Sequence, residues 1–538
     1  MAIVDAASIS NVHWVCLCMH QETELKFVGT EDAMAALRQS GELLELAGTR
    51  RARTMVRRAV YFDSADHLLR KAGYVLRVRN EGNSYSQTLK HLGSGELVTR
   101  PEFKSDVSNV RPELDAIPDS RVRWRITHLL KDKKLEPIFE VDTRRTKILL
   151  MPKRNVEIEA AFDSGEIRLA DGSRRSTPIS EFEVELLRGG VDELFSVARR
   201  LTKDLPLTLS VLSKPDRGFR LARNEERQAY HSTGVQLKTS TSADDAVSAI
   251  ISECLHHLLN NFEVVQAGGE AEGIHQMRVA LRKLRVALSL LSPEQRAPLA
   301  GLAAQARDVA RVLGDGRDYD VLLTDMTFPV AKKLGKDGEF SRLVLAIEAR
   351  RARNQEAIRA CLSSPSFRSF VVEVAAVTYQ RPWLSNASMH STMESDVSSF
   401  ARRQVHRRIS QSSKAVLKSG KLKTAELHAL RIKLKKLRYT TEFFETVLPK
   451  RSARGLLKPI SRLQTMLGKM NDAVVTRTLI RDLLSEQRVG EDASALALAG
   501  GLLIGWHGRR GVEKRTRARK LLRKLVRSDA FRKFDSHI

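Results

Sequence analysis

Tryptophan, tyrosine and cysteine are scarce in this sequence of 538 residues, which contains 4 Trp, 7 Tyr and 4 Cys. Few aromatic rings means few platforms on which bases could stack, and this disfavours a protein that binds single-stranded nucleic acid. The cysteines lack the paired spacing of a metal site beyond one Cys-x-Cys, so we expect reduced thiols in a cytoplasmic protein. They are Cys16, Cys18, Cys254 and Cys361.

Long hydrophobic runs are also missing. The best candidate, residues 495–506, is about a dozen residues long and includes three glycines, whereas a helix that crosses a bilayer needs about 20 apolar residues. We expect it to be a helix in a protein core. The N-terminus has no basic segment followed by an apolar run and a cleavage site, so we expect no secretion signal.

Positive charge is abundant and unevenly distributed. The net charge is +27, and residues 241–538 hold 52 basic against 30 acidic residues, while residues 1–240 hold 39 against 34. The second half is therefore expected to bind a polyanion. A hydrophobic content of 42% is enough for folded cores, which argues against disorder.

A basic stretch occurs twice, at residues 275–285 and 428–438. At about 100° per residue, each copy forms a helix with an apolar face and a cationic stripe. The stripes consist of His275, Arg278, Arg282 and Arg285 in the first copy, and His428, Arg431, Lys435 and Arg438 in the second. Leu-Gly pairs follow both copies at nearly equal spacing, at 313–314 and 467–468. Such a long repeat predicts two similar helical bundles. If the two helices face each other, the stripes form one groove for a long anion.

The first half contains strands in which charged and apolar residues alternate. In residues 22–27 the side chains of Glu22, Glu24 and Lys26 share one face, and the apolar Leu25 and Phe27 share the other. The same alternation recurs around residues 74–79, 88–90 and 181–186. Several such strands predict a sheet that curls around a charged interior and carries helices outside.

A charged interior needs a ligand, because buried charges are costly unless they are paired or ligated. Divalent cations bind carboxylates and phosphate oxygens, and guanidinium or ammonium groups bind the remaining phosphate oxygens. This mixture predicts a site for phosphoryl transfer.

Residues 20 to about 220 resemble the CYTH family of triphosphate tunnel metalloenzymes. Seven motifs of the family occur in order: Glu22-x-Glu24-x-Lys26, Tyr61-Phe62-Asp63, Arg77-x-Arg79, Gln87-Thr88-Leu89-Lys90, Pro137-Ile138-Phe139 ahead of Arg145, Asp163-x-Gly165-Glu166-Ile167, and Glu181-x-Glu183-x-Glu185-Leu186. The resemblance implies a closed antiparallel β tunnel in which glutamates bind Mg²⁺ or Mn²⁺, basic residues hold a triphosphate, and water attacks phosphorus. It implies metal ligands at Glu22, Glu24, Glu183 and Glu185, catalytic roles for Glu22, Glu24 and Lys26, and substrate binding by Arg77, Arg79, Lys90 and Arg145.

Residues 240–538 resemble the CHAD domain, a conserved-histidine α-helical domain that binds inorganic polyphosphate. The resemblance implies that the two cationic stripes, with His275 and His428 at their starts, bind polyphosphate. The order CYTH then CHAD is similar to that of bacterial inorganic triphosphatases. Three aspartates, Asp63, Asp318 and Asp472, are expected to be structural, the last two as ion-pair partners of arginines.

The predicted fold is therefore α+β and multidomain: an N-terminal antiparallel β tunnel with covering helices, and a C-terminal all-α pair of repeated bundles. The predicted boundaries are 1–220 for the tunnel, 221–245 for a linker and 246–538 for the helical domain, with halves at about 246–390 and 391–538. We expect a protein of the cytoplasm or of polyphosphate granules that hydrolyses inorganic triphosphate and binds polyphosphate. The alternatives are a non-enzymatic polyphosphate-binding protein, a hydrolase of an organic triphosphate, a nucleotide cyclase, and a nucleic-acid-binding protein.

Overall fold

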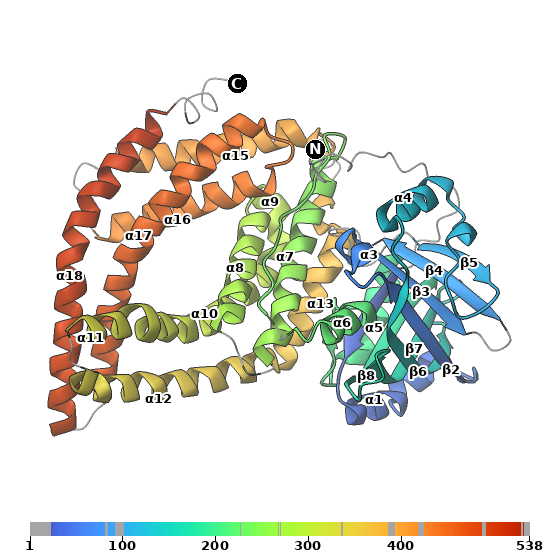
Figure 1. Ribbon diagram of the computed structural model, residues 1–538. Coiled ribbons are helices and arrows are strands. Elements are labelled where there is room, and N and C mark those ends of the chain that lie inside the picture. The colour runs from blue at the N-terminus through green and yellow to red at the C-terminus, as the bar shows by residue number, and fades with distance from the viewer. Residues whose placement is uncertain are drawn as a thin grey trace.

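The computed structural model describes residues 23–80, 84–91, 102–225, 228–266, 268, 271–334, 337–385, 393–417, 424–486, 491–528 and 531. A curled sheet with short helices forms one part, and long helices form the other, with α5 (Val191–Thr202) and α13 (Pro365–Gln380) at their junction (Figure 1). The predicted α+β class and its order of parts are confirmed.

All the strand pairing in the described sheet is antiparallel, and the strand order is β5-β4-β3-β2-β6-β7-β8-β1-β9. The strands are β1 (Thr23–Val28), β2 (Arg53–Asp63), β3 (Tyr74–Asn80), β4 (Tyr85–His91), β5 (Glu102–Val107), β6 (Glu136–Leu150), β7 (Glu157–Leu169), β8 (Ser176–Arg188) and β9 (Thr208–Leu209). Strands as distant in the order as β4 and β1 contribute side chains to the same central cavity. The predicted tunnel is thus a curled sheet that has β5 and β9 at its edges within the described residues.

The alternation of residue types decides which face of each strand points outward. Leu25 and Phe27 of β1 and Phe182 and Val184 of β8 are buried in a core outside the curl. This core includes α1 (Glu31–Arg38), α2 (Gly41–Ala47) and α5. A second core covers β2, β3 and β4 with α3 (Leu68–Lys71) and α4 (Ser120–Leu130). The charged residues on the opposite face are therefore left to line the interior.

Helix α6 (Lys214–Ala222) fills part of that interior. Its Phe219 packs edge-on against Phe139, which stacks on Tyr61 with ring centroids 4.6 Å apart. Ser213 caps the helix through a capping box with Asp216. The interior is thus divided into an apolar portion beside α6 and a charged cavity.

Asp63 is structural, as predicted. Its buried carboxylate accepts hydrogen bonds from the backbone N–H groups of Ser64, Leu69 and Arg70, at 2.8–2.9 Å. These bonds hold α3 at the end of β2.

The helical part contains two runs of long helices. The first comprises α7 (Ala243–Gln266), α8 (Ala271–Leu288), α10 (Ala300–Val321), α11 (Phe328–Leu334), α12 (Asp337–Leu362) and α13, with the short α9 (Pro293–Arg296) and a π-helical turn at Leu322–Thr327. The second comprises α15 (Val397–Leu417), α16 (Thr424–Phe443), α17 (Lys450–Ser485) and α18 (Glu491–Val526). In Figure 1, α10 and α12 extend from the helices next to the sheet toward α17 and α18.

The apolar faces predicted for the two repeated helices are confirmed. Leu281 and Leu284 of α8, and Leu434 and Leu437 of α16, are at most 1% exposed. The apolar run in residues 495–506 lies in α18, where Leu496 and Leu503 are buried in a core shared with α12 and α17. In the described part of the chain, no helix combines the length and the apolar character needed to cross a membrane.

The segment between the two parts packs on the helical part. The backbone N–H of Tyr230 donates to Asn261 Oδ1 at 2.9 Å, and the N–H of Leu237 donates to Thr446 Oγ1 at 3.1 Å. Helix α6 ends at Ala222 and α7 begins at Ala243, close to the predicted linker of residues 221–245.

Candidate functional site

A cavity of about 320 Å³ lies inside the curled sheet. Seven strands and the start of α6 line it, and most of the lining side chains are charged. They are Glu24, Lys26, Arg57, Arg77, Arg79, Lys90, Arg145, Lys147, Asp163, Glu183, Glu185 and Lys214.

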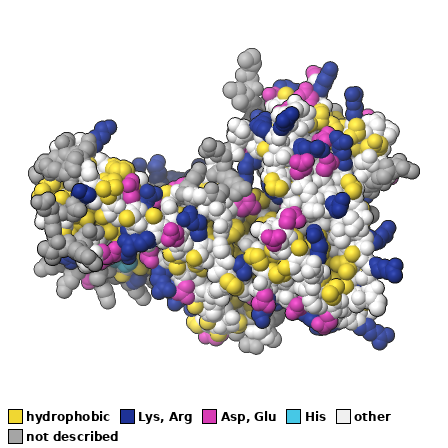
Figure 2. Space-filling model, turned by 90° about the horizontal axis from the view of Figure 1, so that it is seen from below, with side chains coloured by type: hydrophobic (Ala, Val, Ile, Leu, Met, Phe, Trp, Pro, Cys, Tyr) yellow, Lys and Arg dark blue, Asp and Glu magenta, His cyan; other side chains and the backbone are white. Residues whose placement is uncertain are grey.

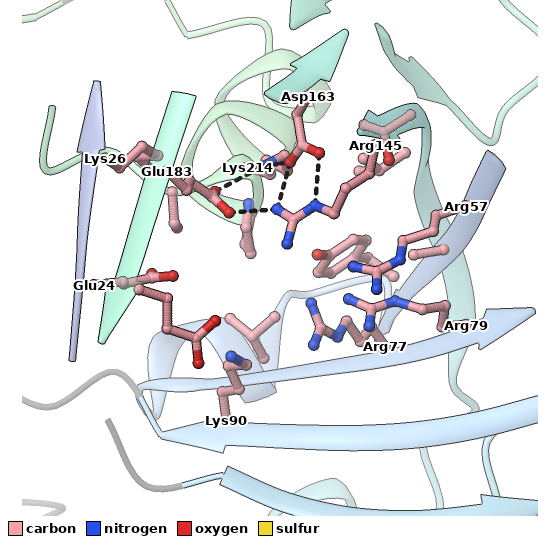
Figure 3. A pocket seen from close by; sticks show the side chains of 18 of the residues that line it. Glu24, Lys26, Arg57, Arg77, Arg79, Lys90, Arg145, Asp163, Glu183 and Lys214 are labelled. Carbon is pink, nitrogen blue, oxygen red and sulfur yellow. Dashed lines mark hydrogen bonds and ion pairs between the residues drawn. The ribbon is translucent and has the colours of Figure 1, made fainter. Parts of the chain in front are cut away.

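Strand register brings the carboxylates of β1 and β8 together, with Lys26 among them. On β1 and β8, Glu24 lies opposite Glu185 and Lys26 lies opposite Glu183. The arginines Arg57, Arg77 and Arg79 project from β2 and β3 and lie together across the cavity from Glu24 (Figure 3). The cavity therefore has a carboxylate-rich wall and a guanidinium-rich wall.

Three carboxylates form a compact cluster, which we call the acidic cluster: Asp163, Glu181 and Glu183. One oxygen from each lies within 4.8 Å of the others. The Nζ of Lys214 lies 2.8 Å from Asp163 Oδ2, 2.6 Å from Glu181 Oε2 and 3.1 Å from Glu183 Oε1. Arg145 donates two hydrogen bonds of 2.6 Å to Asp163 and a third to Glu183.

These ion pairs control the protonation of the acidic cluster. Burial alone would raise the pKa of Glu183, but Lys214, Arg145 and Lys26 outweigh burial and hold that pKa well below its usual value. Burial opposes the charged form of Lys214 as well, yet Glu183, Glu181 and Asp163 raise its pKa. The cluster is therefore ionised at neutral pH, and Lys214 is cationic.

The guanidinium-rich wall carries excess positive charge. Repulsion from Arg77, together with burial, lowers the pKa of Arg79 to about 10. Glu102, from β5, partly offsets this charge: it lies 3.3 Å from Arg77 Nη2 and 2.8 Å from Lys90 Nζ. A dense anion with several oxygens would relieve the remaining repulsion.

The structure brings together all but one of the tunnel residues predicted from the sequence. Glu24, Lys26, Arg77, Arg79, Lys90, Arg145, Glu183 and Glu185 all line the cavity. Glu22 lies outside the described residues. The roles assigned to these residues stay predictions.

Several residues of this site were not predicted. Asp163, Arg57 and Lys147 lie on the charged face of strands and could have been found by extending the period-two pattern. Lys214 had no such signal, because it begins a helix that reaches the cavity only through the tertiary fold.

The cationic stripes of α8 and α16 form a second candidate site. The two helices are in contact, and Arg282 of α8 donates to the hydroxyl of Tyr439 of α16 at 3.3 Å. Repulsion from Arg278 and Arg282 of α8 lowers the pKa of both Arg431 and Lys435 of α16. The middle parts of the two stripes therefore lie close to each other, while a single groove and polyphosphate binding stay predictions.

Individual stripe residues differ in their surroundings. Arg278 donates to the carbonyl of Gly314 and to Asp318, each at 3.2 Å, so Asp318 has the predicted ion-pair role. Burial and the charges of Arg282, Arg431 and Arg278 together lower the pKa of Lys435 to about 7, while Asp472 opposes them.

The remaining stripe residues lie toward the ends of the two helices. His275 is half-buried, His428 is exposed and bonds Asn471 at 3.0 Å, and Arg285 is exposed. Arg438 is held by Glu442 at 2.6 Å and by Gln464 at 3.1 Å.

The face shown in Figure 2 carries Lys and Arg side chains interspersed with Asp and Glu. Both signs of charge therefore mix on that face.

The curled sheet and the long helices correspond to two known domain classes. The family model of the CYTH domain matches residues 20–219, and that of the CHAD domain matches residues 249–481. The chain is thus a CYTH domain followed by a CHAD domain.

Among curated proteins, the chain is similar to an inorganic triphosphatase of Haemophilus influenzae, with 32% identity over 167 residues. The alignment covers 31% of this chain and 46% of that protein, so the chain spans about half the length of this relative. Among solved structures it is similar to the CHAD domain of the plant Ricinus communis, with 25% identity, a TM-score of 0.49 and coverage of 55% of this chain and 97% of that one. It is also similar to PptA from Streptomyces chartreusis, with 15% identity, a TM-score of 0.40 and coverage of 54% and 100%.

Proposed function

We propose that the CYTH domain hydrolyses inorganic triphosphate with Mg²⁺ or Mn²⁺ and that the CHAD domain binds inorganic polyphosphate. The observation that carries the proposal is the cavity in which a carboxylate-rich wall faces a guanidinium-rich wall. This division suits a substrate that bridges metal-binding carboxylates and phosphate-binding cations. The similarity to an inorganic triphosphatase supports the choice of substrate.

The donor set fits a hard divalent cation. Glu24, Glu183 and Glu185 supply oxygen ligands on β1 and β8, and the acidic cluster adds Asp163 and Glu181. Glu22 is predicted to join them. When bound, the metal supplies charge neutralisation for the phosphate oxygens.

The chain's cations bind and orient the triphosphate in this proposal. Arg77, Arg79, Lys90 and Arg145 hold phosphate oxygens from β3, β4 and β6, and Lys26 does so from β1. Their fixed placement stabilises charge that develops on the leaving oxygens. Water adds to a terminal phosphorus and the bond to the bridging oxygen breaks, so the products are orthophosphate and pyrophosphate.

A non-enzymatic polyphosphate-binding protein is the second candidate. The observation that favours it is that Lys214 and Arg145 already pair with all three carboxylates of the acidic cluster. In that case the carboxylates would serve only to balance basic residues.

Phosphate release by the purified full-length protein distinguishes the two candidates. Tripolyphosphate, ATP and long-chain polyphosphate are each supplied with Mg²⁺, Mn²⁺ or EDTA. We expect metal-dependent release from tripolyphosphate far above release from the other two, together with retention of the protein on immobilised polyphosphate at physiological salt. No release from any substrate, with polyphosphate still bound, would establish the binding protein instead.

Charge reversal at Glu24, a predicted metal ligand, tests its role in the same assay. Glu24→Lys should lower metal-dependent turnover about a hundredfold or more, because it places a cation in the carboxylate-rich wall. Glu42→Lys is the matched control, since Glu42 is exposed on α2, away from the cavity. Unchanged turnover in Glu24→Lys would remove Glu24 from the mechanism.

A further inference from the structure

Lys214 occupies the place among the carboxylates that a divalent cation would take. Its ammonium group contacts one oxygen of each residue of the acidic cluster, at 2.6–3.1 Å. An ammonium group thus contacts all three residues of a cluster in which one oxygen from each lies within 4.8 Å of the others. Its side chain also lines the cavity and so can reach a ligand there.

A cation that entered the acidic cluster would have to compete with this ammonium group. A metal ion needs the carboxylate oxygens that Lys214 contacts, and the two positive charges repel each other at short range in a site shielded from water. A triphosphate removes the conflict, because its oxygens give the lysine a new partner.

We propose that Lys214 is an internal counter-ion of the acidic cluster. It leaves these carboxylates, and so allows a metal ion to bind them, only when a triphosphate enters the cavity. Lys214 then passes from the carboxylates to the phosphate oxygens. This inference rests on the proposed function in taking triphosphate as the ligand of the cavity. It makes Lys214 a residue that couples metal binding to substrate binding.

The structure lets the side chain move while its helix stays fixed. Arg217 of α6 contacts Glu181 at 2.9 Å, and Asp216 contacts Arg70 of α3 at 2.7 Å. Phe219 is buried against Phe139. The backbone of α6 is therefore anchored at three points, whereas the lysine ammonium sits on a flexible four-carbon stem.

The test measures binary affinities of the full-length protein by titration calorimetry. Lys214→Met removes the charge at similar length and should tighten Mn²⁺ binding in the absence of phosphate at least tenfold. The same variant should bind tripolyphosphate in EDTA at least tenfold more weakly. Lys214→Arg keeps the charge and should retain the weak Mn²⁺ binding of the natural protein. Mn²⁺ affinity that is unchanged or weaker in Lys214→Met overturns the proposal.

Two further variants locate the effect. Adding Glu183→Gln to Lys214→Met should abolish the gained Mn²⁺ affinity, because it removes a carboxylate of the acidic cluster. Lys133→Met removes an exposed lysine of the same domain that pairs with Asp66 and does not line the cavity, and should leave phosphate-free Mn²⁺ affinity unchanged. A tenfold gain in Lys133→Met would show a general charge effect and overturn the assignment to Lys214. Because Mn²⁺ is titrated without phosphate, the result holds whether or not the protein hydrolyses tripolyphosphate.

Discussion

Lys435 is a titratable group of the α16 stripe, close to arginines of both α8 and α16. Burial and the charges of Arg282, Arg431 and Arg278 lower its pKa to about 7, against the opposing charge of Asp472. The free lysine is therefore neutral above that pH and cationic below it. Because a polyanion binds the cationic form, polyphosphate affinity should fall as pH rises from 7 to 8.5, by up to about tenfold per pH unit.

Fluorescence or calorimetric titration of polyphosphate across this range measures the effect. Lys435→Arg is the matched control, since arginine stays charged throughout. This variant should bind with little pH dependence above pH 7. If the polyphosphate affinity of Lys435→Arg falls with pH as steeply as that of the natural protein, another group causes the pH dependence.

Helix α6 depends on the absence of a side chain at Gly218. A Cβ atom there would lie 2.3 Å from Cε2 and 2.5 Å from Cδ2 of Phe139, a fully buried ring. Gly218→Ala should therefore destabilise the CYTH domain by about 1–3 kcal/mol despite the better helix propensity of alanine. Calorimetric unfolding of the full chain would show a lower transition temperature.

Gly41→Ala in α2 is the control for this prediction. A Cβ atom at Gly41 meets nothing within 4 Å. The substitution should therefore leave the transition temperature unchanged or raise it slightly. Equal effects at the two glycines would show that the contact with Phe139 does not limit stability.

Elements with a clear period could be predicted from the sequence, and their arrangement could not. Alternation placed Glu24 and Glu183 on the charged face of strands, and the 3.6-residue period placed Leu281 and Leu434 in cores. The pairing of β2 with β6 joins residues more than 70 positions apart, and no local pattern specifies it. Lys214 escaped prediction for the same reason, since its place beside Asp163 follows from how α6 returns to the sheet.

At the scale of the whole molecule, one apolar core continues from the sheet into the helices. It includes Phe195 and Leu201 of α5 together with Phe370 and Val377 of α13. The α13 helix also contacts β9, which leads into the segment that carries Lys214. The CHAD domain thus supports a wall of the CYTH cavity.

An ion pair between α5 and α13 can be used to test whether the CHAD domain stabilises the CYTH domain. Arg199 of α5 donates from Nε and Nη2 to the two carboxylate oxygens of Glu373 of α13, at 2.5 Å and 3.3 Å. Both side chains are about one-third exposed, so solvent weakens the pair. Its expected contribution to the free energy of unfolding is about 1 kcal/mol. Glu373→Arg should lower the unfolding temperature of the CYTH domain, because it places two guanidinium groups together. The exchange Arg199→Glu with Glu373→Arg restores opposite charges and should recover most of the loss. If the doubly substituted protein is instead destabilised by the sum of the two single effects, the pair does not join the domains.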